Sequence, residues 1–149
     1  MFRYPDFFKV GIAESGNHDN RNYEDDWGER YNGLAENVDY EKQANQIYAK
    51  NLKGKLLLIH GEIDNNVHPA NTLRVVNALI KANKRFDLVL LPGQRHGYGD
   101  MTEYFFWRQA DYFAEHLLGD KTGRSETEIE EMTKEMEQSN KAAAGGRRN

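Results

Sequence analysis

The chain has 149 residues, of which 20 are basic and 24 acidic, so its formal net charge is -4 at pH 7. This balance disfavours nucleic acid and anionic membranes as partners, because both select basic surfaces. Cysteine is absent, which excludes disulfides, thiolate zinc sites and cysteine nucleophiles. The apolar runs are far shorter than the roughly 20 residues of a membrane-spanning helix, and the first residues do not resemble a signal peptide. We therefore expect a soluble chain with one folded domain.

Three short apolar runs predict β-strands. Residues Phe8–Ala13 are compatible with a short strand. Residues Lys55–His60 include four consecutive apolar side chains without alternation, which indicates a strand buried on both faces. Phe86–Leu91 repeats that pattern. The sequence therefore predicts three strands, two of them fully buried.

Helical patterns separate and follow these strands. A shorter helix is predicted over Tyr40–Lys50, and Pro69 suits the first residue of a second helix. The apolar face predicted for that second helix carries Leu73, Val76, Leu79 and Ile80. Thr102–Leu118 shows the same periodicity. Buried strands that alternate with helices predict the α/β class and a parallel sheet.

The composition changes near residue 119. Residues 1–119 carry the α/β pattern, and residues 120–149 form a polar tail that we expect to be partly helical and partly disordered. Ser125–Glu128 resembles a capping box at the start of a helix, whereas Ala142–Asn149 has the composition of a disordered end. The helix of the tail could dock on a partner or lie on the surface, and the sequence leaves both open.

Two residues with catalytic chemistry follow the second and third predicted strands. Asp64 comes after Lys55–His60, and His96 comes after Phe86–Leu91. In a parallel sheet the loops at the carboxyl ends of the strands share one edge, where ligands bind. An imidazole beside a carboxylate suits a general base whose tautomer is fixed. A turn aspartate and a loop histidine without any relation are the alternative.

A metal site is another interpretation of the same loops, since His60, Asp64, His68 and His96 could converge. However, the spacing His-x-x-x-Asp-x-x-x-His matches no zinc signature, and Gly61 would interrupt a helix that aligned the ligands. We therefore expect neither a metal nor another cofactor.

The order of the two candidate residues points to a known family. α/β-Hydrolases carry the triad in the order Ser, Asp or Glu, His, with the last two on late strands. Residues Leu57–His68 and Gly93–Gly97 resemble the acid and histidine segments of dipeptidyl peptidase IV-like serine peptidases of the prolyl oligopeptidase family. Residues Phe8–Ala13 and Glu29–Gly33 are similar to the strand and short helix that follow the family's nucleophile. The resemblance covers about residues 4–118 and implies a partial α/β-hydrolase fold, consisting of its last three parallel strands with flanking helices.

The resemblance also implies roles for individual residues. Asp64 would be the triad acid and His96 the general base, while His60 would be a structural histidine at the end of a buried strand. The side chains implied for the substrate pocket, which would suit proline or alanine, are Asn66, Val67, Tyr23 and Trp27. Ordinary aromatic packing is the alternative for the last two. The segment Ser15–Asn20 is more polar than its counterpart in animal enzymes, which affects the expected shape of the pocket.

The Gly-x-Ser-x-Gly elbow that presents the nucleophile in this fold is missing from the sequence. The serines are Ser15, Ser125 and Ser139, and none has glycines at both required positions. The resemblance places the nucleophile, the oxyanion donors and a β-propeller upstream. We therefore expect part of a longer peptidase that acts on peptides by acyl transfer and is inactive by itself. The choice between dipeptide release and internal cleavage stays open, as does the compartment, for which a periplasmic or secreted parent is one option.

A second class of function stays open beside the enzyme. A non-catalytic α/β-hydrolase-like binding module, or pseudoenzyme, would keep the cleft without a nucleophile. The coding sequence upstream of Met1 distinguishes the two, because a peptidase predicts an in-frame Gly-x-Ser-x-Gly there. Without a neighbouring strand, Phe8–Ala13 would leave an open sheet edge, so we also predict self-association or marginal stability.

Overall fold

A computed structural model describes residues 1–145 of the chain. The backbone forms two compact units, one from Met1 to Thr102 and one from Glu103 onward. No helix within the described part of the chain is long and apolar enough to cross a membrane.

The first unit is built on a parallel sheet in the order β1-β2-β3. The strands are β1 (Val10–Glu14), β2 (Lys55–Gly61) and β3 (Asp87–Leu91). In the register of the sheet, Leu57 of β2 lies opposite Ile12 on one side and Asp87 on the other. The α/β class and the three predicted strands are therefore confirmed, with bounds that shift by up to two residues. The burial predicted for the third strand is wrong, because β3 ends the strand order of this unit and its Asp87, Leu88 and Leu90 are exposed.

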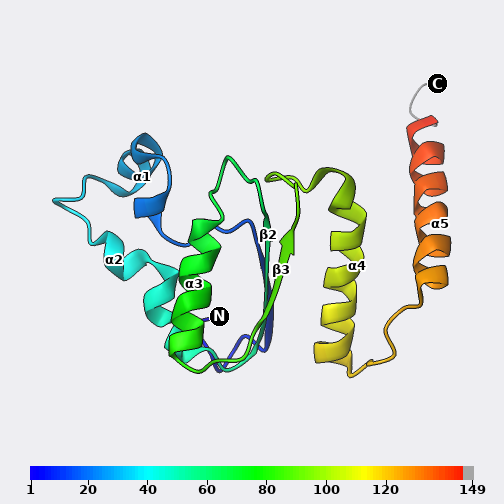
Figure 1. The fold of residues 1–149 in the computed structure, drawn as a ribbon, viewed down its shortest axis with the longest axis horizontal. Helices are drawn as coiled ribbons and strands as arrows, with labels where there is room; N and C mark the ends of the chain where they lie inside the picture. Colours follow the sequence, from blue (N-terminus) through cyan, green and yellow to red (C-terminus); the bar gives the residue numbers. More distant parts are fainter. Residues whose placement is uncertain (146–149) are drawn as a thin grey trace. The chain divides into compact units, whose positions relative to one another are not determined.

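The middle strand explains why this sheet folds. All residues of β2 after Lys55 are buried, as the run of apolar residues without alternation predicts. Helix α3 (Ala70–Lys81) connects β2 to β3 and runs alongside the sheet (Figure 1). The core between the helix, β2 and the preceding segment consists of Ala49, Leu52, Leu56, Leu58, Val75 and Leu79.

The predicted apolar face of α3 is only partly correct. Leu79 is fully buried, but Leu73 is exposed and Ile80 has 63% of its surface accessible. The buried face instead includes the polar residues Asn71 and Thr72. Asn71 hydrogen-bonds to the backbone of Asp19 and Asn22 in the segment after β1, and Thr72 bonds to His60 near the end of β2. These bonds fix which face of α3 turns inward.

The crossover from β1 to β2 consists of short helical pieces. They are a 3₁₀ turn at Asn20–Asn22, helix α1 (Asp25–Asn32), helix α2 (Tyr40–Gln43) and a 3₁₀ segment at Asn45–Asn51. The single helix predicted over Tyr40–Lys50 is therefore interrupted. The break is at Ala44, whose ψ of 131° is extended rather than helical.

The second unit is helical. Helix α4 (Thr102–Phe113) continues as a π-helical turn over Ala114–Leu118, as the periodicity of this segment predicts, and ends at Gly119 with a φ of 76°. Helix α5 covers Glu126–Gly145. Its predicted capping box is present, since the Ser125 amide donates to Glu128 Oε2 at 2.8 Å and the Glu128 amide donates to Ser125 Oγ at 3.3 Å. The helix extends through residues 142–145, where disorder was expected, and the rest of that prediction lies outside the described residues.

Candidate active site

Asp64 lies in the loop that follows β2, at the carboxyl end of the sheet. Its side chain is buried, and Oδ1 accepts the backbone N–H groups of Asn66 and Val67 at 2.9 and 3.0 Å. Aspartate side chains often accept bonds from backbone amides a few residues further along the chain, and such bonds form a local turn. The turn leaves the other carboxylate oxygen, Oδ2, available for a second partner.

His96 lies in the loop after β3, which leaves the same end of the sheet as the loop after β2 (Figure 1). The backbones of the two loops are bonded to each other, since the Ile63 amide donates to the Gln94 carbonyl at 3.1 Å. Gly61 permits this approach, because a Cβ atom there would lie 2.5 Å from the carbonyl oxygens of Gln94 and Arg95. Close contact between the loops therefore depends on the absence of a side chain at Gly61.

The two candidate residues meet directly. His96 Nδ1 lies 2.9 Å from Asp64 Oδ2, and the imidazole keeps 45% of its side-chain surface accessible while the carboxylate is covered. Burial opposes ionisation of Asp64, but the bonds from His96 and from the Asn66 and Val67 amides outweigh it and lower the pKa of this carboxyl. The ionised carboxylate accepts a hydrogen bond from Nδ1–H, which leaves the Nε2 lone pair free to act as a base.

A second histidine, His60, lies close to Asp64 in the interior of the fold. His60 is fully buried, with Nε2 at 2.7 Å from the Val67 carbonyl oxygen and Nδ1 at 2.7 Å from Thr72 Oγ1. Because a carbonyl only accepts, Nε2 carries the proton and Nδ1 accepts from the threonine hydroxyl. Both nitrogens therefore have partners within the fold.

The four side chains expected in a substrate pocket differ in their surroundings. The Tyr23 hydroxyl donates to Asn66 Oδ1 at 2.8 Å, and the rings of Tyr23 and Trp27 meet edge to face with centroids 5.8 Å apart. Asn66 is exposed, whereas Val67 is buried. The aromatic pair on and before α1 is therefore connected through Asn66 to the turn that holds Asp64.

A polar network supports this aromatic segment, and no pattern in the sequence predicts it. Asp19 is buried, and its carboxylate accepts bonds from Arg21 and Gln46 and lies 3.3 Å from Arg74 Nη1. Although burial raises the pKa of Asp19, the bonds from Arg21 and Gln46 dominate and hold it at about 2. Asn71 Oδ1 accepts the Asp19 amide at 3.2 Å. The segment after β1 is thereby fixed to α3.

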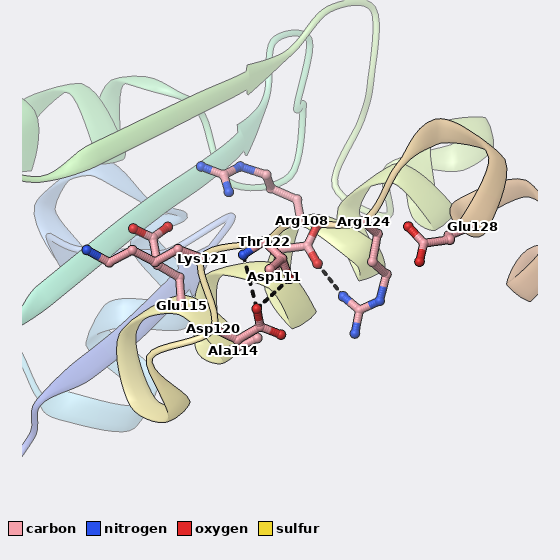
Figure 2. A pocket seen from close by; sticks show the side chains of 10 residues that line it. Arg108, Asp111, Ala114, Glu115, Asp120, Lys121, Thr122, Arg124 and Glu128 are labelled. Atoms are coloured by element: carbon pink, nitrogen blue, oxygen red, sulfur yellow. Dashed lines mark hydrogen bonds and ion pairs between the residues drawn. The ribbon is translucent and has the colours of Figure 1, made fainter.

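A separate cavity of about 380 Å³ lies in the second unit, around the turn between α4 and α5 (Figure 2). Figure 2 shows Arg124 paired with Asp111, and Asp120 bonded to Thr122. Acidic and basic side chains both line the cavity. This arrangement favours no particular charge of ligand, and we assign the cavity no function.

The three serines of the chain lie in different settings. Ser15 is buried just after β1, where its hydroxyl donates to the Tyr98 hydroxyl at 2.9 Å. Ser125 donates to Glu128 Oε2 at 2.7 Å as part of the helix cap, and Ser139 is exposed on α5. None of these contacts joins a serine to His96.

Comparison with known proteins extends these observations. Residues 1–120 match the profile of the prolyl oligopeptidase family. Dipeptidyl peptidase family member 1 of Caenorhabditis elegans is 28% identical over 116 residues, which are 77% of this chain and 14% of that protein. Inactive dipeptidyl peptidase 10 of Rattus norvegicus is 29% identical over 105 residues, which are 68% of this chain and 13% of that protein.

A solved structure supports the same relationship. The crystal structure of Porphyromonas gingivalis dipeptidyl peptidase 4 superimposes with a TM-score of 0.72 and 32% sequence identity, over 77% of this chain and 17% of that one. The chain thus spans less than a fifth of the length of these relatives. Its parallel strands and flanking helices form part of an α/β-hydrolase fold. By sequence and by structure, the chain belongs to the prolyl oligopeptidase family of serine peptidases.

Proposed function

We propose that this chain contributes the acid and the base of a serine peptidase, with Asp64 as the acid and His96 as the base. The bond of 2.9 Å between His96 Nδ1 and Asp64 Oδ2 carries this proposal. It joins a covered carboxylate to a half-exposed imidazole, which suits a base that must reach a substrate while its partner is kept from water.

The reaction would proceed by acyl transfer. A serine hydroxyl attacks the carbonyl carbon of the peptide bond while His96 Nε2 takes the hydroxyl proton, and Asp64 stabilises the imidazolium that forms. The imidazolium then gives its proton to the leaving amine as the carbon–nitrogen bond breaks. Water, deprotonated by the same imidazole, attacks the acyl ester, which releases the carboxylic acid and restores the serine.

The substrate side would be formed by Tyr23, Trp27, Asn66 and Val67. The bond from Tyr23 to Asn66 holds the aromatic pair next to the turn of the acid, so a residue beside the scissile bond would contact aromatic faces. Such a surface suits a compact apolar residue such as proline or alanine. The names of the relatives, which include dipeptidyl peptidases, support peptides as substrates.

The serine nucleophile would lie outside these 149 residues. The sequence holds no Gly-x-Ser-x-Gly, and the buried Ser15 is bonded to Tyr98 rather than to an imidazole. The oxyanion donors would be missing with it, because one of them is the amide that follows the nucleophile. The chain alone should therefore have no peptidase activity.

The test begins with the coding sequence upstream of Met1. An open frame with Gly-x-Ser-x-Gly is expected, and the longer polypeptide should cleave a chromogenic dipeptide with proline or alanine before the scissile bond. Asp64→Asn and His96→Ala should each lower kcat by roughly 10³–10⁴-fold without unfolding the protein. His68→Ala, in an exposed histidine of the same loop, serves as the control with near wild-type turnover. Near wild-type turnover in either of the first two variants would refute the assignment.

A non-catalytic binding module is the second candidate. The relative named Inactive dipeptidyl peptidase 10 favours it, because this family includes members so described. A stop codon just upstream of Met1, or an open frame without the serine motif, would select this candidate. The same aromatic surface at Tyr23 and Trp27 would then bind peptide without cleaving it.

A further inference from the structure

Two residues at the carboxyl edge of the sheet have an unusual backbone conformation. Three non-glycine residues with positive φ occur in the described chain: Ser15 at 40°, Asn83 at 54° and Tyr98 at 59°. Asparagine adopts the left-handed region readily, but serine and tyrosine do so at an energetic cost. Such strain persists only where the surrounding structure fixes it, and it concentrates at functional sites.

Ser15 and Tyr98 are bonded to each other. The two buried hydroxyl oxygens lie 2.9 Å apart, although the residues belong to loops after different strands. Both also contact the carbonyl oxygen of Ile59 in β2, since the Ser15 amide donates to it at 2.9 Å and the Tyr98 hydroxyl lies 3.4 Å from it. The pair therefore ties the end of β1 and the loop after β3 to the end of the middle strand.

This bond lies next to the candidate base. Tyr98 follows His96 by two residues, and its amide donates to the Arg95 carbonyl at 3.2 Å, which closes the turn that carries His96. The His96 ring itself is half exposed and is held by its bond to Asp64. The position of the ring thus depends on the backbone of the turn, and the buried side chain of Tyr98 anchors that backbone.

We propose that Ser15 and Tyr98 form a buried hydrogen-bonded pair that positions His96 within hydrogen-bonding distance of Asp64. They are positioning residues, since neither contacts the imidazole through the bonds described above. The consequence for catalysis rests on the proposed function, but the effect on the position of the His96 ring does not. A phenylalanine at position 98 would keep the ring buried and remove the hydroxyl, which makes the hydroxyl bond itself testable.

The experiment uses ¹⁵N NMR of the 149-residue chain to measure the ratio of the Nδ1–H to the Nε2–H tautomer of His96. The bond to Asp64 predicts that Nδ1–H dominates in the wild type. Tyr98→Phe and Ser15→Ala should each lower the ratio by roughly three- to tenfold, the scale of one hydrogen bond. The double variant should add nothing to Tyr98→Phe, because the tyrosine hydroxyl is the only partner of the Ser15 hydroxyl among the described residues and its loss already removes their bond. Tyr40→Phe removes another buried tyrosine bond, to the Gly33 carbonyl, and should leave the ratio unchanged.

An unchanged ratio in both single variants, or additive effects in the double variant, would overturn the proposal. If Tyr98→Phe unfolds the chain, Ser15→Ala still decides, since it retains the tyrosine ring. The measurement needs no nucleophile, so it separates the two proposals. If the variants change the tautomer ratio while the longer polypeptide lacks peptidase activity, the positioning role of the Ser15–Tyr98 pair is supported and the proposed function is contradicted.

Discussion

The buried imidazole of His60 lies 3.3 Å from Asp64 Oδ2, the same oxygen that His96 Nδ1 contacts at 2.9 Å. One carboxylate oxygen thus lies between two imidazoles, of which one is fully buried and the other is half exposed. The buried ring also bonds the Val67 carbonyl and the Thr72 hydroxyl. His60 therefore links the turn of the acid to helix α3.

Replacement of His60 should destabilise the fold. His60→Phe would leave the Val67 carbonyl and the Thr72 hydroxyl buried without their partner, and each such group costs about 1–3 kcal/mol. We expect the free energy of unfolding in urea, followed by circular dichroism, to fall by about 2–4 kcal/mol. His68→Phe changes an exposed histidine of the same loop and loses only the bond from the Ala70 amide to His68 Nδ1, so it should cost about 1 kcal/mol or less. Equal losses of unfolding free energy in both variants would show that the buried bonds of His60 do not contribute to stability.

A side chain at Gly61 should disturb the candidate site. In Gly61→Ala the new methyl group would lie 2.5 Å from the carbonyl oxygens of Gln94 and Arg95, so the loops of Asp64 and His96 must separate. We expect a loss of about 1–3 kcal/mol in unfolding free energy, the usual cost of overpacking, and shifted amide resonances at His96. Gly97→Ala is the matched control, because nothing lies within 4 Å of a Cβ there. A neutral Gly61→Ala would mean that the loops are farther apart in solution.

Stability should depend on pH through His18. This residue is 9% exposed, and burial together with the nearby His60 lowers its pKa to about 4 from an ordinary 6.5. Between these values the unfolded chain binds more protons than the folded one, so the stability falls as the pH falls from about 7 to 4. The loss of unfolding free energy from this residue is at most about 3–4 kcal/mol. Below pH 4 His18 adds nothing further, and the carboxyls of Asp19 and Asp64, whose pKa values are lowered, lose their contribution as they protonate.

Urea unfolding at several pH values between 7 and 4 measures this dependence. His18→Gln should flatten the profile in that window, because the group that takes up the proton on unfolding has been removed. His68→Gln should keep the wild-type slope, since this ring is exposed. A His18→Gln profile as steep as that of the wild type would assign the dependence to other groups.

The sequence predicts the parts of the fold that depend on continuous apolar runs. β2 is found because a buried parallel strand needs such a run, and the meeting of Asp64 with His96 follows from their position after neighbouring strands. The run in β3 identifies the strand but not its exposure, because β3 ends the strand order of its unit. The face of α3 is not predicted in full, because hydrogen bonds from Asn71 and Thr72 draw polar residues inward.

Other features have no local signal at all. The bond between Ser15 and Tyr98 joins residues far apart in the chain, and neither the serine nor the tyrosine indicates a left-handed backbone. The network around Asp19 likewise depends on distant residues such as Arg74. Periodicity reports which side chains are apolar, but it does not report which polar groups find partners after the chain has folded.

The buried face of α3 can be tested by substituting one leucine that lies on it and one that does not. Leu79→Ala removes a fully buried side chain and should lower the free energy of unfolding by about 2–5 kcal/mol. Leu73→Ala changes an exposed leucine of the same helix and should cost less than about 1 kcal/mol. Comparable losses for the two variants in urea unfolding would restore the face predicted from the sequence, which includes both leucines.

The outer edge of β1 should cause self-association. Within the described residues β1 pairs with β2 alone, and the residues before it include Phe7, which is 78% exposed. Since the Ser15 amide faces β2, alternation along the strand turns the Ile12 amide outward, where another chain could accept it. Sedimentation velocity over a range of concentrations should show reversible association.

Ile12→Pro should weaken this association by roughly tenfold, because it removes an outward donor at an edge where proline is tolerated. Ile12→Ala is the control, since it shortens the same side chain and keeps the amide. A similar effect of both variants would indicate that side-chain burial drives the contact instead of strand pairing. A wild-type chain that is monomeric at every concentration would contradict the prediction. It would indicate that another segment of the chain covers the outer edge of β1.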